Sequence, residues 1–232
     1  MALFLLKLLS VGVVATLIFS ASGADLSWSA DRTTLPDKAH PLHVDLQKRQ
    51  VLLYTEVNQK NWDKPNPHWG VVYRGGKLGD KALLSAYCTP EEFHDALLKI
   101  GANPGNNLPA DHTNTLVQGD ELSVSVLRPD LNRSLSLADV IFDQTGKGFH
   151  IRFGGNLERA AKEKTGCITC LESCPVGITS NAAYPAISSW KRFLSPNSLF
   201  KVKTEILPAQ EGATVILIYQ LKPKKIYSSM ED

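Results

Sequence analysis

The stretch Glu121-Leu122-Ser123-Val124-Ser125-Val126-Leu127 alternates polar and apolar side chains from end to end. Successive side chains of a β-strand point to opposite faces of the sheet, so this period of two predicts a strand with one buried face. A second stretch, residues 214–219, is apolar and β-branched almost throughout. That composition predicts a buried strand near the centre of a sheet. The two stretches together indicate a fold built around β-structure.

Shorter stretches on both sides of these two extend the β pattern. Residues 41–46 and 51–57 are predicted to pair as a hairpin across a charged turn. Residues 140–142 and 149–153 are predicted to form a second hairpin across a turn rich in polar residues and glycine. Further strands are expected at residues 70–73, 200–207 and 213–221.

One helix is marked by the residues at its ends. Thr89-Pro90-Glu91-Glu92 supplies a capping hydroxyl, a proline at the first helical position and a glutamate three residues after the cap. Apolar residues then recur on one face until Gly101, which ends the predicted helix. A second, shorter helical stretch is predicted at residues 157–164.

These elements predict an α+β fold, a mainly antiparallel β-sheet with one or two helices and a cysteine-rich loop. No internal repeat or low-complexity linker divides the chain, so residues 24–232 are expected to form a single domain. The 232 residues are 43% hydrophobic and 21% charged, as in a globular protein that buries a core. The net charge of +2 gives no reason to expect a nucleic-acid partner.

The N-terminus carries the order of a secretory signal peptide. Residues 1–7 hold one positive charge, residues 8–19 are almost wholly apolar, and small residues follow at 20–24. We therefore expect residues 1–23 to be a cleaved signal and the protein to be exported to the periplasm, with no stable membrane span afterwards. An uncleaved N-terminal anchor is the alternative. No arginine precedes Arg32, so the twin-arginine route used by preassembled cluster proteins is not indicated.

Three of the four cysteines lie in one short segment, residues 166–177, with the spacing C-x2-C-x3-C-P. Cys167, Cys170 and Cys174 match the last three positions of a bacterial ferredoxin run, and Lys164 stands at the first. This spacing predicts an iron–sulfur or related metal site that these three thiolates ligate, and Cys88 is a possible fourth ligand. Cys88 directly precedes the capped helix, where the helix dipole favours a thiolate.

Other chemistries remain open for the same thiols. Zinc is compatible with three or four thiolates, although a second C-x2-C pair is missing. Covalent haem is excluded, because Leu171 stands where its motif requires histidine. A redox dithiol at Cys167 and Cys170 lacks the βαβ context of that motif. Four cysteines in an exported chain also fit two disulfides with no cofactor.

The histidines are scattered along the chain and none belongs to a recognisable catalytic motif. Any of them is a possible fourth ligand, and ordinary surface or capping roles are the alternative. The residues concerned are His40, His43, His68, His94 and His150.

The mature chain as a whole resembles the YdjY-domain proteins. The resemblance is carried by residues 41–57, by His68-Trp69-Gly70-Val71-Val72, by residues 93–107, and by the cysteine segment with Thr179-Ser180-Asn181 after it. It implies an exported bacterial protein that is described as ferredoxin-like because of its cysteines. It implies no known activity.

The sequence therefore predicts an exported protein that holds an iron–sulfur cluster or related metal and transfers electrons to a redox partner of unknown identity. Two alternatives stay open. One is a disulfide-stabilised binding or interaction module, and the other is a thiol redox protein.

Overall fold

The computed structural model describes residues 35–64, 68–109, 114–186 and 199–223, so the predicted signal peptide at residues 1–23 lies outside it. Twelve strands are defined in this part of the chain. They are β1 (Leu42–Asp45), β2 (Gln50–Val57), β3 (Trp69–Tyr73), β4 (Leu84–Ala86), β5 (Glu121–Arg128), β6 (Arg133–Ser136), β7 (Ile141–Asp143), β8 (Ile151–Phe153), β9 (Cys167–Cys170), β10 (Thr179–Asn181), β11 (Phe200–Val202) and β12 (Thr214–Leu221). The α-helices of the described residues are α1 (Pro90–Lys99), α2 (Leu137–Val140) and α3 (Leu157–Glu163).

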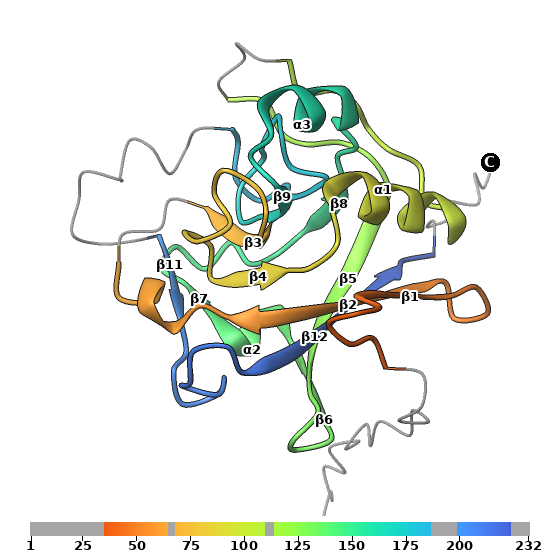
Figure 1. The fold of residues 1–232 in the computed structure, drawn as a ribbon. Coiled ribbons are helices and arrows are strands. Elements are labelled where there is room, and N and C mark those ends of the chain that lie inside the picture. The colour runs from red at the N-terminus through yellow and green to blue at the C-terminus, as the bar shows by residue number, and fades with distance from the viewer. Residues whose placement is uncertain (1–34, 65–67, 110–113, 187–198, 224–232) are drawn as a thin grey trace, which may run out of the picture.

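Eight of the strands close into a barrel (Figure 1). They pair in the order β2, β12, β5, β8, β10, β9, β3 and β4, and β4 then pairs back onto β2. The remaining strands extend this barrel or lie apart from it: β1 pairs with β2, β6 pairs with β5, and β7 and β11 form a small separate sheet. The prediction of an α+β fold was therefore wrong, because the described residues form a mostly β structure that closes into a barrel and has only short helices.

Closure depends on the shortest strands. β1 pairs with the first half of β2, at residues 50–53, and β4 pairs with the second half, at residues 55–57. The three residues of β4 also pair in parallel with β3. A three-residue strand shows too little alternation to be recognised, so this link was not predicted.

The cysteine segment contributes a barrel strand and is not the excursion between strands that was predicted. β9 pairs antiparallel with β3 on one side and parallel with β10 on the other. The four residues of β9 thus belong to a strand that pairs on both edges.

Several local predictions are confirmed and one is wrong. β1 and β2 form the predicted hairpin, and β12 is the predicted central strand, with β2 and β5 on its two sides. Helix α1 begins with the predicted capping box at Thr89. The second predicted hairpin does not form, because β7 pairs with β11 and β8 pairs with β5 and β10.

Side chains fill the interior of the barrel. Tyr219 of β12 is fully buried and packs edge-on against Phe93 of α1, with ring centroids 4.8 Å apart. Its hydroxyl meets that of Thr169 on β9 at 2.7 Å, and Thr169 meets Thr179 on β10 at 2.8 Å. A void between the apolar side chains of the interior holds only about 20 Å³. The described interior around it is therefore a packed core.

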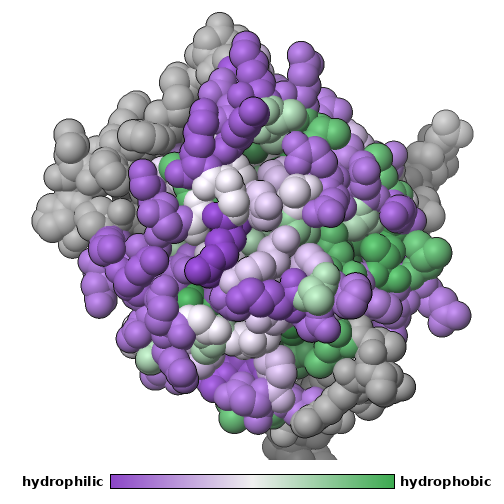
Figure 2. Space-filling view, viewed as in Figure 1, coloured by the Kyte–Doolittle hydropathy of each residue, from purple (hydrophilic) through white to green (hydrophobic). Residues whose placement is uncertain are grey.

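The surface is mainly hydrophilic in the view of Figure 2, and hydrophobic residues gather at its right edge, where Figure 1 places α1 and β1. Leu98 of α1 is 44% exposed, and Leu46, which follows β1, is 64% exposed. Among the described residues, no helix combines the length and the apolar character that crossing a bilayer requires.

A candidate metal centre of three thiols and a histidine

The sulfurs of Cys167 and Cys170 share one side of β9 because the strand is irregular. In a regular strand, residues three apart point to opposite faces. The register between β3 and β9 shifts on both sides of the pair of Val71 with Thr169, which lies between the pair of Trp69 with Cys170 and the pair of Val72 with Cys167. This bulge lets both thiols join one buried cluster with Cys174, apart from the main core.

Cys174 reaches the same cluster because the chain turns back tightly after β9, over residues 171–177, a segment called the return below. The amide of Leu171 donates to the carbonyl oxygen of His68 at 2.8 Å, and the amide of Gly177 donates to that of Cys174 at 3.3 Å. A Cβ atom on Gly177 would lie 3.1 Å from the sulfur of Cys170 and 2.9 Å from the hydroxyl of Ser180. Only glycine therefore fits the return without displacing the sulfur.

His68, directly before β3, places an imidazole against the thiols. One nitrogen of its ring and the sulfurs of Cys170 and Cys174 all lie within 4.8 Å of one another. Nδ1 of His68 lies 3.0 Å from a carboxylate oxygen of Glu172, and the two side chains are only 9% and 1% exposed. Glu172 thus lies at Nδ1, and the ring of His68 also hydrogen-bonds with Cys174.

The charges in this cluster depend on one another. Burial lowers the pKa of His68, but hydrogen bonds with Cys174 and Glu172 outweigh it and raise the pKa to about 9. Hydrogen bonds with Cys170 and Cys174 lower the pKa of Cys167 well below its usual value, against the effect of burial. The same hydrogen bonds from Cys167 and Cys174, together with burial, raise the pKa of Cys170. One thiolate is thus stabilised by two neighbouring thiols.

Two buried hydroxyls border the thiols and lack ordinary hydrogen-bond partners among the described residues, namely those of Thr165 and Ser180. Thr165 precedes Cys167 by two residues and contributes to the lowering of its pKa. Ser180 pairs in register with Cys170. Buried hydroxyls without a partner are costly, whereas a thiolate bound to a metal accepts such hydrogen bonds. The surroundings of the sulfurs therefore fit a charged, metal-bound state.

The structure brings together three of the four predicted ligands. Cys88 instead belongs to the main hydrophobic core, near Tyr219 and Glu92, and burial followed by the charge of Glu92 raises its pKa strongly. Its place beside the helix end does not produce a thiolate, because desolvation outweighs the helix dipole. The other three thiols belong to a separate buried cluster.

His68 was one of five histidines without a distinguishing pattern, and Glu172 was assigned no role. The structure separates His68 from the others. His40 and His150 have side chains that are 86% and 59% exposed, and His94 packs against Phe153. The sequence does contain a feature that could have identified Glu172. It is a charged residue two positions before Cys174, in a segment whose other residues are suited to burial.

The comparisons with known proteins cover the whole of this centre. The family model of the YdjY domain matches residues 42–220. The protein described as "Uncharacterized protein YdjY" of Escherichia coli (strain K12) is 38% identical over 179 residues, which make up 77% of this chain and 78% of that relative. No solved structure matches the chain.

Proposed function

Because the chain belongs to the YdjY-domain family and the matched residues include its own barrel and cysteine segment, we propose that it is an exported metalloprotein. It binds one thiophilic metal ion through Cys167, Cys170, Cys174 and His68. Zinc is the best fit to this set of donors. The bound ion ties the cysteine segment to the start of β3.

The single observation that carries this proposal is how closely the ligand atoms approach one another. Those of His68, Cys170 and Cys174 lie within 4.8 Å of each other. Around one tetrahedral ion, with zinc–sulfur bonds of about 2.3 Å, the sulfurs lie within about 4 Å of one another. A cluster attaches its thiolates to separate iron atoms and so holds the sulfurs further apart. The spacing of these three donors therefore favours a single ion. Cys167 lies outside this group but hydrogen-bonds with Cys170 and Cys174, so a small movement of its sulfur makes it the fourth ligand.

Glu172 supports the same assignment. An imidazole that binds a metal commonly donates its other N–H to a carboxylate, which fixes the tautomer and increases the basicity of the ligating nitrogen. Glu172 stands in that position at Nδ1 of His68. Four protein donors and near-complete burial are typical of a closed zinc site, because a catalytic site leaves one position open to substrate.

An iron–sulfur protein of electron transfer is the second candidate, and the spacing C-x2-C-x3-C-P favours it. For a cluster to bind, the segment around Cys174 has to move away from β9. In the metal-free protein, the order Cys174, His68, Glu172 is also that of a thiol nucleophile, its base and an orienting carboxylate. The 4% exposure of Cys174 disfavours this reaction with a large substrate.

The test is the metal content of the full chain after export and anaerobic purification without chelators. We expect one zinc per chain, no acid-labile sulfide, and no zinc in the variants Cys174→Ser and His68→Ala. Cys88→Ser and His94→Ala are the matched controls and retain the metal. Iron and sulfide in equal amounts would support the second candidate, and a chain that takes up neither metal after reconstitution would overturn both.

A further inference from the structure

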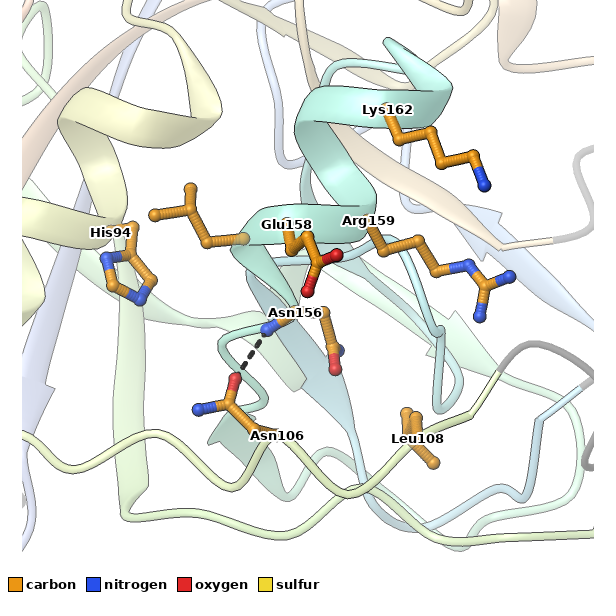
Figure 3. Close-up of a pocket in the computed structure, with 8 residues that line it drawn as sticks. His94, Asn106, Leu108, Asn156, Glu158, Arg159 and Lys162 are labelled. Atoms are coloured by element: carbon orange, nitrogen blue, oxygen red, sulfur yellow. Dashed lines mark hydrogen bonds between the residues drawn. The ribbon is translucent and has the colours of Figure 1, made fainter.

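A second candidate site lies beside α3, in an open cavity of about 550 Å³ (Figure 3). This volume is in the range of pockets that hold small metabolites. Asn156 joins the cavity to the cysteine segment, because its side-chain amide donates to the carbonyl oxygens of Cys174 and Gly177 at 3.3 Å each. The thiols themselves do not line the cavity. Whatever binds there is a separate ligand from the metal.

The floor of the cavity is held in shape by two asparagines. Asn106 and Asn156 both adopt left-handed backbone conformations, with φ of 48° and 51°. The side-chain oxygen of Asn106 accepts a hydrogen bond from the amide of Asn156 at 2.9 Å, drawn in Figure 3. The amide of Asn106 donates in turn to the carbonyl oxygen of Gly154 at 2.7 Å. Strained residues that are fixed in this way cluster at binding sites.

Positively and negatively charged side chains of one helix line the cavity. Glu158, Arg159 and Lys162 all project from α3 in Figure 3, and Glu158 lies above Asn156. None of the three forms an ion pair with another described residue. Two cations and one carboxylate give the lining a net charge of one positive. This balance suits a ligand with one carboxylate better than a phosphate dianion.

Apolar and aromatic groups complete the lining. Leu108 is buried at its lower side, Leu157 of α3 also lines it, and His94 of α1 forms the far wall. The ring of His94 is fixed by an edge-on contact with Phe153 at 5.1 Å between centroids. The cavity thus offers hydrocarbon surface next to the charges, as a small molecule with an apolar side chain requires.

We propose that this cavity binds a small zwitterion of the amino-acid type, an activity beyond the metal site. Its carboxylate pairs with Arg159 and Lys162, its ammonium group pairs with Glu158, and its side chain lies against Leu108 and Leu157. The side-chain nitrogen of Asn106 donates a hydrogen bond to it, and Asn156 holds Asn106 in place. The observation behind the assignment is that cations, a carboxylate and leucine side chains share one preformed cavity.

The test uses matched probes on the ¹⁵N-labelled full chain: L-leucine, N-acetyl-leucine without the ammonium group, leucinamide without the carboxylate, and inorganic phosphate. We expect leucine to cause saturable shifts of the backbone amides of Asn106 and Asn156. N-acetyl-leucine binds more weakly, and leucinamide and phosphate do not bind. No saturation by leucine at about 10 mM, or equal binding of leucinamide, overturns the proposal.

Two substitutions test which side chain pairs with the carboxylate of leucine and which pairs with its ammonium group. Arg159→Gln weakens leucine binding by about tenfold or more, because it removes a charge-assisted hydrogen bond, and the matched Arg133→Gln on β6 leaves binding unchanged. Glu158→Gln abolishes the preference for leucine over N-acetyl-leucine. If Arg159→Gln alters the spectrum of α3 without ligand, Lys162→Gln provides the same comparison. Binding that is unchanged in both cation variants overturns the assignment, and phosphate binding in place of leucine overturns the choice of a carboxylate ligand.

Discussion

Nδ1 of His68 lies 3.0 Å from Oε1 of Glu172, and both side chains are buried between β3 and the return that follows β9. A buried carboxylate is costly unless it is paired, so this contact has a strong effect on the orientation of the imidazole. It turns the other nitrogen of the ring toward a cluster of thiols. The proposed metal site rests on this relationship as much as on the cysteines themselves.

Glu172→Gln tests that relationship directly. The substitution keeps the shape of the side chain but removes the charge that orients His68 and increases its basicity. We expect zinc affinity to fall by about 10- to 100-fold, measured by competition with a chromophoric chelator. Glu211→Gln is the matched control, because Glu211 is a half-exposed partner of Lys60, far from the thiols in sequence and contacts. Equal affinities of the two variants would contradict a role for Glu172.

Gly177→Ala tests how tightly the return packs on the sulfur. The added methyl group would lie 3.1 Å from the sulfur of Cys170 and displace it. We expect a loss of about 1–3 kcal/mol in the free energy of unfolding together with weaker zinc binding. Gly146→Ala separates the two effects. Gly146 has a φ of 70° and nothing within 4 Å of an added Cβ, so this variant loses about 1 kcal/mol with its zinc affinity intact. Unchanged zinc binding in Gly177→Ala would show that the site accommodates the added methyl group without displacing the sulfur of Cys170.

Two substitutions in the barrel interior should lower the free energy of unfolding by different amounts, because only one of them leaves a buried hydroxyl without its partner. Tyr219→Phe removes the hydroxyl that meets Thr169 but leaves Thr169 bonded to Thr179, so we expect a loss of about 1 kcal/mol. Thr169→Val leaves the hydroxyl of Tyr219 buried without that partner, and the loss should reach about 2–3 kcal/mol. Urea unfolding measures both. The reverse order would mean that the hydroxyl of Tyr219 finds another partner or reaches water.

The lowered pKa of Glu56 predicts that the stability of the fold depends on pH. Burial raises its pKa, but hydrogen bonds from Tyr87, Lys38 and Tyr54 outweigh that effect and lower the pKa below 4.5. Since the pKa is lower in the folded state, Glu56 stabilises the fold above pH 4.5, and the contribution is lost as the pH falls through the folded-state pKa.

The variant Glu56→Gln should therefore lose about 2 kcal/mol in the free energy of unfolding at neutral pH and approach the wild type at about pH 3. Urea unfolding at the two pH values provides the comparison. A deficit of Glu56→Gln that is the same at both pH values would show that its charge contributes nothing.

The sequence predicted the elements whose signal is local. The capping box at Thr89, the hairpin of β1 and β2 and the central strand β12 all follow from short-range patterns, and the structure contains them. The closed barrel was missed because closure depends on the three-residue strand β4, and the hairpin of β7 and β8 was wrong because β7 pairs with β11, almost sixty residues further along the chain.

The candidate site, too, was predicted only where its sequence signal is local. The spacing of Cys167, Cys170 and Cys174 indicated that the three thiols act together, and in the structure they share one buried cluster. The bulge that aligns the first two is a property of the pairing between β3 and β9 and leaves no mark in the spacing. His68 joins through that same pairing, about a hundred residues before Cys174, so its selection from five histidines required the fold.

X-ray absorption at the metal edge of the reconstituted full chain tests the central claim most directly. We expect one ion with three sulfur neighbours at about 2.3 Å and one imidazole nitrogen at about 2.0 Å, and no bound zinc in His68→Ala. Metal–metal scattering at short distance, from a cluster, would contradict it, as would a shell of four sulfurs that includes Cys88.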